Sequence, residues 1–337
     1  MKLSFTPQTL ILKHPFTVAA GTRCSTPVVF TEIEHNGIVG FGEASMPPYL
    51  GESHESVMGF LSKVDMSNFR NPLDLKNILS EIDEIDLNNN AAKASIDIAL
   101  HDLAGKILDK PLGDFLGINT HEFPLSSFTI GIDTPQKIRE KIREASDFKI
   151  LKIKLGKGDD KKIIEAVCSE TDKIFSVDVN QGWKDKYFAL DMIYWLKEKG
   201  AIYIEQPLAK EFVDEMAWIT ERSPLPTIAD EAVKRLKDID NAKDVYHGIN
   251  IKLMKSTGIN EAHEMIKVAR AFGMKIVIGC MSESSCAVTA AAHLSPLADW
   301  ADLDGASLIK NDFFEGIKIV EGRISLNKKA GIGINKI

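Results

Sequence analysis

The sequence predicts an α/β protein: a barrel of eight parallel strands preceded by a separate α+β module. Three observations support this. Short apolar runs recur about every 20 to 28 residues from residue 123 onward, helix-length segments separate them, and the first 115 residues follow a different pattern. Eight strands alternating with helices are typical of a TIM-type barrel, whereas an open doubly wound sheet usually has fewer strands and a glycine-rich phosphate turn.

The α+β module is expected to occupy residues 1–115. Residues 28–34 and 38–43 flank the turn His35-Asn36-Gly37, which predicts a β-hairpin. Residues 53–107 have a helical apolar pattern.

The barrel is expected to occupy residues 116–310. Its eight predicted strands begin near Phe123, Ile150, Ile174, Ala201, Leu225, Gly248, Met274 and Ala301. No convincing helix follows the eighth strand, and residues 317–327, with a turn at Glu321-Gly322, predict a second hairpin. We expect residues 311–337 to return to the N-terminal module.

Composition excludes several classes of protein. Lys plus Arg total 41 against 48 Asp plus Glu, a net charge of −7, which argues against a nucleic-acid partner. No stretch approaches the roughly 18 apolar residues of a membrane span. We therefore expect a cytoplasmic protein, and the sequence leaves open whether it forms a homo-oligomer.

Cysteine and histidine give no sign of a disulfide framework or a zinc site. The four cysteines include no CxxC pair, and the eight histidines show no HExxH or HxH spacing. Any metal ion is therefore expected to have oxygen ligands.

Acidic residues end three successive predicted strands of the barrel. Asp178, Glu205 and Asp230 are separated by 27 and 25 residues, about one βα unit each. In a TIM-type barrel these strand ends meet at the active-site face. Three converging carboxylates would repel one another, and a hard divalent cation, Mg²⁺ above all, would relieve that repulsion.

Lysines are predicted on either side of this cluster. Lys154 lies one strand before it and Lys252 one strand after it, while Lys152 shares a strand face with Lys154. A cation beside a carboxylate can stabilise the enediolate formed when a neighbouring proton is removed. Two lysines on opposite sides would allow removal from one face and return to the other. Taken alone, the Lys152/Lys154 alternation is more typical of a half-buried strand.

The motifs that carry this chemistry resemble the enolase superfamily, muconate-lactonising-enzyme subgroup. They are KIK at 152–154, VDVN at 177–180, IEQP at 204–207, ADE at 229–231 and NIKLMK at 250–255. The resemblance implies a (β/α)₇β modified TIM barrel with an α+β capping domain completed by the C-terminal segment. It also implies one Mg²⁺ per subunit on the three carboxylates, with Lys154 and Lys252 as the acid and base.

Within that subgroup, ADLDG at 301–305 is similar to the DxD motif of dipeptide epimerases. There, two aspartates bind the free ammonium of a dipeptide, and the resemblance assigns this role to Asp302 and Asp304. It also implies that Thr129, Lys152 and Ser282 line the dipeptide site.

The second residue of such a dipeptide is less well defined by the sequence. Arg23, in a predicted capping loop, could bind an acidic side chain or pair with Glu52 or Glu55. Residues 46–50 favour small or apolar side chains, which predicts broad Ala-Xaa activity that includes Ala-Ala. L-Ala-D/L-Glu epimerisation is the alternative, and either activity would belong to the metabolism of peptidoglycan peptides.

Three other functions remain open on the sequence. A succinylbenzoate synthase or cycloisomerase would keep the fold but give Asp302 and Asp304 no ammonium to bind. A Schiff-base aldolase would use one lysine covalently and would not need three acidic ligands. A barrel that binds ligands without catalysis would exchange no substrate proton with solvent.

Overall fold

A computed structural model describes residues 1–47, 50–120 and 122–337. The chain begins with an antiparallel sheet of β1 (Lys2–Val18), β2 (Gly21–His35) and β3 (Ile38–Ser45), paired in chain order. His35 pairs with Ile38, and Asn36 and Gly37 both have positive φ, so the predicted hairpin and its turn are confirmed. The long strand β1 was not predicted.

The helical stretch of residues 53–107 is divided into α1 (His54–Leu61), α2 (Leu75–Glu84) and α3 (Asn90–Ile107), and α4 (Leu112–Phe115) follows. Most of α3 is buried because it packs directly on β3. Two glycines of β3 allow this approach: a Cβ on Gly42 would lie 1.9 Å from the backbone oxygen of Ser95, and one on Gly40 would lie 2.1 Å from that of Ala99.

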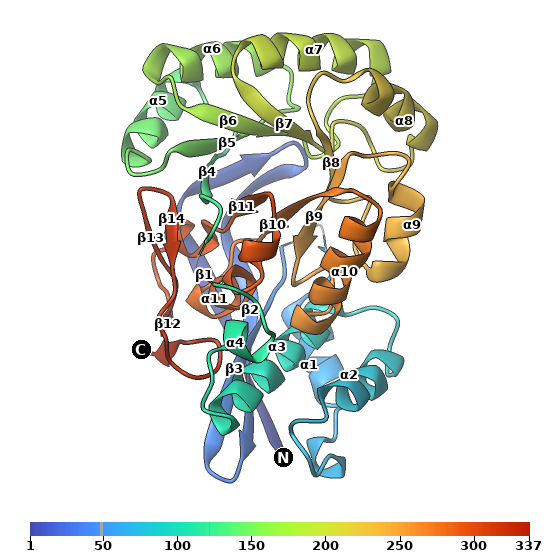
Figure 1. Ribbon diagram of the computed structural model, residues 1–337. Coiled ribbons are helices and arrows are strands. Elements are labelled where there is room, and N and C mark those ends of the chain that lie inside the picture. The colour runs from blue at the N-terminus through green and yellow to red at the C-terminus, as the bar shows by residue number, and fades with distance from the viewer. Residues whose placement is uncertain (48–49, 121) are drawn as a thin grey trace.

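Eight parallel strands form the second layer of the architecture (Figure 1). In chain order and in sheet order alike they are β4 (Ser127–Ile130), β5 (Ile150–Lys154), β6 (Ile174–Asp178), β7 (Ala201–Glu205), β8 (Thr227–Ala229), β9 (Gly248–Lys252), β10 (Lys275–Gly279) and β11 (Trp300–Asp302). A parallel bridge between Ser126 and Ala301 brings the first and last strands together. The predicted barrel is confirmed.

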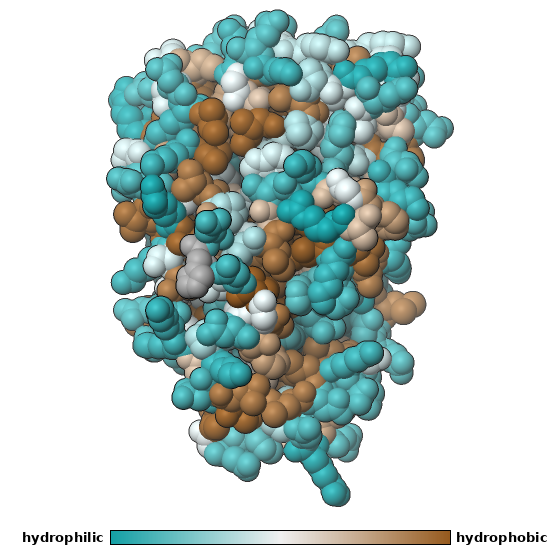
Figure 2. Space-filling model, viewed as in Figure 1, coloured by the Kyte–Doolittle hydropathy of each residue, from teal (hydrophilic) through white to brown (hydrophobic). Residues whose placement is uncertain are grey.

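Helices follow each of the first seven barrel strands. They are α5 (Pro135–Glu144), α6 (Asp160–Glu170), α7 (Lys186–Glu198), α8 (Val213–Arg222), α9 (Ile239–Ala242), α10 (Ile259–Ala271) and α11 (Ser285–Ala292). After β11 the 3₁₀ turn η5 (Gly305–Leu308) takes the place of an eighth α-helix, so the pattern is (β/α)₇β. The outer surface over α6 and α7 is predominantly hydrophilic, as expected for helices that bury one face on a barrel (Figure 2).

The C-terminal segment contacts both parts of the molecule. Strand β12 (Phe314–Glu315) pairs with β15 (Asn335–Lys336), and the Phe314 ring packs edge-on against Phe30 of β2 and Phe41 of β3. The predicted hairpin is present as β13 (Lys318–Val320) and β14 (Arg323–Ser325). Its turn lies at the barrel, where the Ser126 amide donates to the Gly322 carbonyl. No helix in the described residues is long and apolar enough to cross a membrane.

Candidate active site

A cavity opens at the C-terminal ends of the barrel strands. The capping sheet contributes Phe16, Val18 and Arg23 to its wall, and the barrel contributes lysines and carboxylates from most of its strands. Its charged lining residues from the barrel are Lys152, Lys154, Lys210, Asp230, Glu231, Lys234, Lys252, Lys255, Asp302 and Asp304. The cavity therefore lies where the two parts of the chain meet.

The three predicted metal ligands lie together beside this cavity: Asp230 lines it, and Asp178 and Glu205 lie behind the lining lysines Lys152 and Lys154. Asp178 ends β6, Glu205 ends β7 and Asp230 follows β8, and all three are buried. One carboxylate oxygen from each lies within 4.8 Å of the others. Parallel strands in register produce this convergence, since Asp178 pairs directly with Glu205 in the sheet.

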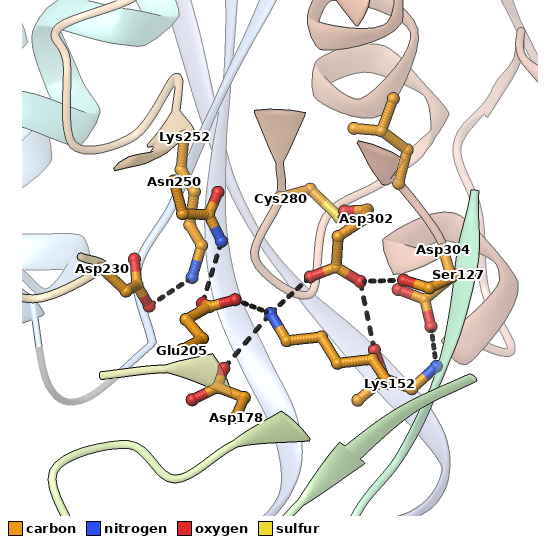
Figure 3. Close-up of polar contacts among 12 residues, drawn as sticks. Ser127, Lys152, Asp178, Glu205, Asp230, Asn250, Lys252, Cys280, Asp302 and Asp304 are labelled. Carbon is orange, nitrogen blue, oxygen red and sulfur yellow. Dashed lines mark hydrogen bonds and ion pairs between the residues drawn. The ribbon is translucent and has the colours of Figure 1, made fainter. Parts of the chain in front are cut away.

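Lysines contact every member of the cluster (Figure 3). Lys154 Nζ lies 2.5 Å from Asp178 Oδ2, and Lys252 Nζ lies 2.7 Å from Asp230 Oδ2. The two lysines thus flank the carboxylates from β5 on one side and β9 on the other. This is the arrangement that the strand order predicts.

Lys152 is held differently from the two flanking lysines. Its ammonium contacts Asp302 Oδ2 at 2.7 Å, Glu205 Oε2 at 2.8 Å and Asp178 Oδ2 at 3.2 Å. Burial alone would lower its pKa, but the charges of Asp302, Glu205 and Asp178 outweigh burial and raise the pKa of Lys152 well above its ordinary value. Lys152 therefore remains a cation and is unsuited to act as a base.

The carboxylate oxygens of the three predicted ligands fit a divalent cation. Burial, followed by the charge of Asp178, raises the pKa of Glu205 to about 8. Ionising Glu205 beside the other two carboxylates is therefore energetically unfavourable without a cation. Glu205 Oε2 is fully buried and accepts no hydrogen bond of good geometry from the described residues, although Lys152 Nζ is close to it. Oxygen ligands of this kind suit Mg²⁺.

Asp302 and Asp304 line the same cavity beside the cluster, since Lys152 contacts both Asp302 and Glu205. Asp302 ends β11 and pairs with Lys152, while Ser127 Oγ donates to Asp302 Oδ1 at 2.9 Å. The two-residue spacing of Asp302 and Asp304 would place both aspartates on one face of a continued strand, but β11 ends at Asp302 and Asp304 lies at the start of η5. The turn nevertheless keeps Asp304 buried in the site, where the Thr129 amide donates to its Oδ2 at 2.6 Å.

Of the two aspartates, Asp304 is the less well stabilised in its ionised form. Burial, and then the neighbouring charge of Asp302, raises the pKa of Asp304 to about 7. Asp302, by contrast, has a lowered pKa because Lys152 outweighs its burial. A positively charged ligand group beside Asp304 would relieve this cost.

Arg23 joins the capping sheet to the barrel mouth. Its Nη2 donates to Ser282 Oγ at 2.9 Å, and its guanidinium lies 5.0 Å from the centre of the Phe16 ring. Glu52 instead accepts hydrogen bonds from the first amides of α3, those of Ala91 and Ala92. These contacts favour a place for Arg23 in the cavity over the suggested pair with Glu52.

The apolar capping loop is only partly described. Leu50 lines the cavity, and Met46 is fully buried in the core. Pro48 and Tyr49, which we also expected to favour apolar side chains, lie outside the described residues.

Two polar residues behind the carboxylates were not assigned a role from sequence. Lys255 Nζ lies 2.6 Å from Asp230 Oδ1, and Asn250 Nδ2 donates to Glu205 Oε1 at 2.9 Å. Asn250 precedes Lys252 by two positions on β9, so both face the barrel interior. That spacing was the available sequence signal for Asn250.

Comparisons with known proteins agree with this geometry. Residues 3–117 match the mandelate racemase/muconate lactonizing enzyme N-terminal domain, and residues 136–336 match the enolase C-terminal domain-like family. An L-Ala-D/L-Glu epimerase of Bacteroides thetaiotaomicron is 53% identical over 100% of this chain and 88% of its own length. An L-Ala-D/L-amino acid epimerase of Pedosphaera parvula is 38% identical over 96% of each chain.

A solved structure gives the same result. The dipeptide epimerase of Cytophaga hutchinsonii, complexed with Mg and the dipeptide D-Ala-L-Val, superposes with a TM-score of 0.92 at 26% identity, covering 99% of this chain and 95% of the other. These similar proteins are racemases and epimerases, and the present chain is likewise an isomerase. The chain belongs to the mandelate racemase/muconate lactonizing enzyme family of the enolase superfamily.

Proposed function

We propose that this isomerase epimerises the α-carbon of the C-terminal residue of Ala-Xaa dipeptides. The observation that carries the proposal is that two sets of carboxylates lie at one cavity. One is the cluster between Lys154 and Lys252, and the other is the Asp302/Asp304 pair. A dipeptide has a carboxylate at one end and an ammonium at the other, which matches these two sets. The epimerases similar to this chain support the same substrate class.

Asp178, Glu205 and Asp230 would hold one Mg²⁺ per subunit. When bound, this ion supplies charge neutralisation for the substrate carboxylate while the neighbouring α-carbon is deprotonated. Lys154 and Lys252 would exchange the α-proton from opposite faces, since they approach the cluster from strands on opposite sides. Removal by one lysine and return by the other inverts the stereocentre.

The remaining polar groups bind and orient the dipeptide. Asp304, with Asp302 beside it, would accept hydrogen bonds from the ammonium, at the end of the cavity formed by Thr129. Lys152 stays charged and joins the two sets of carboxylates, because it contacts both Asp302 and Glu205. The capping part, residues 1–115 with 311–337, would enclose the second residue of the dipeptide.

The structure favours an acidic second residue within this substrate class. Arg23, Lys210 and Lys234 line the cavity in addition to the four lysines that contact the carboxylate cluster, so these three further cations face the ligand space. The relative from Bacteroides thetaiotaomicron is named for Ala-Glu. We therefore propose that Ala-Glu ranks above Ala-Ala, with apolar dipeptides as poorer substrates.

The aldolase alternative finds little support in these contacts. A Schiff-base lysine must become neutral to attack a carbonyl, and Lys152 is held in the charged form by three carboxylates. A cycloisomerase would leave Asp304 buried beside Asp302 with no cationic ligand group.

A panel of dipeptides incubated in deuterated water tests the proposal. We expect deuterium incorporation and inversion at the second residue of Ala-Glu and Ala-Ala, both abolished by EDTA and restored by Mg²⁺. N-acetyl-Ala-Glu keeps the carboxylate and the α-proton but loses the ammonium, and should lose orders of magnitude in kcat/KM, since each charge-assisted hydrogen bond is worth about 1.5–3 kcal/mol. Equal rates with and without the acetyl group would exclude a dipeptide epimerase.

A further inference from the structure

The three carboxylates of the cluster share one pattern of contacts. In each, one oxygen accepts a hydrogen bond from a donor outside the cluster, while the other oxygen faces the lysines at its centre. The outer donors are the Asn180 amide on Asp178 Oδ1 at 2.9 Å, Asn250 Nδ2 on Glu205 Oε1 at 2.9 Å and Lys255 Nζ on Asp230 Oδ1 at 2.6 Å. The inner oxygens are Asp178 Oδ2, Glu205 Oε2 and Asp230 Oδ2.

The outer donors are fixed by the fold. Lys255 lies in the turn after β9, where its ammonium also contacts the carbonyls of Asp230, Val233 and Asn250. Asn250 lies within β9, and its amide group packs against Gly279 of β10, where a Cβ would lie 2.5 Å from Asn250 Oδ1. Neither group can move away without disturbing the ends of neighbouring strands.

The inner oxygens contact three lysines that line the open cavity. Lys154 and Lys252, which the proposed function assigns to proton transfer, contact Asp178 Oδ2 and Asp230 Oδ2, and Lys152 contacts Asp178 Oδ2 and Glu205 Oε2. Lys255 lines the cavity too, but backbone carbonyls also hold its ammonium. A cation entering the cluster would therefore meet three inner oxygens, while the outer oxygens remain engaged.

We infer that Asn250 and Lys255 are positioning residues that limit each carboxylate to one ligand oxygen and thereby select Mg²⁺ over Ca²⁺. This inference rests on the proposed cation site. Ca²⁺ takes six to eight oxygens and readily uses both oxygens of a carboxylate, whereas Mg²⁺ requires near-octahedral geometry and keeps several waters. Three single-oxygen ligands suit the smaller ion.

The test is calorimetric titration of the purified full-length protein with Mg²⁺ alone and with Ca²⁺ alone. Lys255→Met frees Asp230 Oδ1, and Asn250→Leu frees Glu205 Oε1. The readout is the ratio of the two dissociation constants, because loss of the Lys255 charge affects both divalent ions alike and largely cancels in the ratio. In each variant we expect the ratio to shift toward Ca²⁺ by about tenfold or more, the lower end of what groups behind a metal ligand contribute.

Two further variants separate positioning from charge and from stability. Lys255→Gln is neutral like Met but keeps a donor, so its ratio should stay closer to that of the parent protein. Lys93→Met is the matched control, since Lys93 is also a buried lysine that contacts one carboxylate, Asp83, and backbone carbonyls, and it lies outside the cavity. Its ratio should not change.

The titrations distinguish failure of this inference from failure of the proposed cation site. An unchanged ratio in both folded variants, or an equal shift in Lys255→Gln and Lys255→Met, overturns the inference while leaving the proposed function intact. If Lys255→Met does not fold, Asn250→Leu decides the question alone. A parent protein that binds neither ion overturns the proposed cation site itself.

Discussion

Four lysines contact the carboxylate cluster, and the surroundings of Lys152, Lys154 and Lys252 give these three different tasks. Lys152 touches three carboxylates, whose charges raise its pKa well above the ordinary value, so it serves as a fixed cation. Lys154 and Lys252 each hydrogen-bond one carboxylate at the edge of the cluster and line the cavity. The division follows from position in the barrel, since all three share the same side-chain chemistry.

Replacing Lys252 by Ala should separate proton exchange from inversion. The resemblance to the enolase superfamily implies that Lys154 would serve the L epimer and Lys252 the D epimer. Lys252→Ala should therefore still exchange the α-proton of L-Ala-L-Glu with deuterated water, while its rate of epimerisation falls about 10²- to 10⁴-fold, the usual contribution of a general acid or base. NMR follows both processes in one sample.

Lys154→Ala is the reciprocal control, with exchange retained only for the D epimer. If both single variants epimerise at the parent rate, the two-base scheme is wrong.

The acidic pair predicts a pH dependence of substrate affinity. The pKa of Asp304 is raised to about 7 by burial and by Asp302, and in the proposed function the dipeptide ammonium would pair with the ionised form. Lowering the pH through 7 protonates Asp304, so KM should rise, while above about pH 8 the substrate amino group loses its charge and KM should rise again. Measuring KM for Ala-Glu between pH 5.5 and 9 should give this two-limbed profile. In Asp304→Asn the rise of KM below pH 7 should disappear. If that rise persists in the variant, it belongs to the titration of another group.

Sequence reasoning found the residues that end strands but missed those that support them. Asp178, Glu205 and Asp230 follow apolar runs at βα spacing, which makes their convergence predictable. Lys255 lies within the NIKLMK motif, but its contact with Asp230 depends on how the turn after β9 folds back, which the motif does not show. The position of Asn250 two residues before Lys252 indicates that it faces the barrel interior but not that it contacts Glu205.

At the scale of elements, the barrel strands were predictable and β1 was not. Each barrel strand is an apolar run bounded by helix-length segments, and the observed starts agree with the predicted ones within four residues. Strand β1 contains Pro7 and Pro15, and most of its residues are exposed or half-buried. It is an edge strand that pairs along its length with β2 and makes only an isolated bridge, Leu12 to Ile309, on its other side among the described residues, so its sequence is not required to carry a core pattern.

The loop between β10 and α11 joins the barrel to the capping sheet through buried carboxylates. Glu43 of β3 accepts hydrogen bonds from the Ser284 amide at 2.9 Å and from the Ala287 amide, at the start of α11. Glu283 accepts from the Met281 amide at 2.8 Å. Burial, and then the charge of Glu43, raises the pKa of Glu283 to about 8.

The raised pKa of Glu283 predicts that the protein loses stability as the pH rises. The folded-state pKa of Glu283 exceeds its unfolded value near 4.5, so its stabilising contribution is complete below pH 4.5 and is lost as the pH rises through about 8. Glu283→Gln keeps the acceptor for Met281 and cannot ionise. Urea unfolding should show little difference between the variant and the parent at pH 5. At pH 8 the variant should be more stable by about 4 kcal/mol, since the pKa shift from 4.5 to about 8 is worth about 1.4 kcal/mol per unit and Glu283 is half ionised in the folded protein at that pH. A difference that does not change with pH would contradict this assignment.

At the scale of the whole molecule, the proposed function takes its proton-transfer groups from the barrel, whereas the capping sheet adds Arg23 to the residues proposed to select the substrate. The lysines and carboxylates that surround the proposed reacting carbon all belong to barrel strands or to the turns after them. The capping sheet closes one side of the cavity, and the C-terminal segment fastens that sheet through Phe314 and through the ion pair of Lys336 with Glu32. Changes in the cap can therefore alter which dipeptide fits without altering proton transfer.

Arg23 allows this division to be tested. It lies at the start of β2, lines the cavity and donates to Ser282 Oγ, so it reaches the substrate space from the cap. Arg23→Ala should lower kcat/KM for Ala-Glu by about 10- to 100-fold, the value of a hydrogen bond to a charged group, and change that for Ala-Ala by less than about threefold.

The variant should still exchange the α-proton of its best dipeptide at a rate close to that of the parent, because Lys154 and Lys252 are untouched. Ser282→Ala is the matched control: it removes the hydroxyl that Arg23 Nη2 contacts but keeps the guanidinium charge, so it should retain the preference for Ala-Glu. A ranking of dipeptides that is the same in the parent and in Arg23→Ala would mean that Arg23 only ties the cap to the barrel. Selection of the second residue would then belong to Lys210 and Lys234, the other cations at the cavity wall.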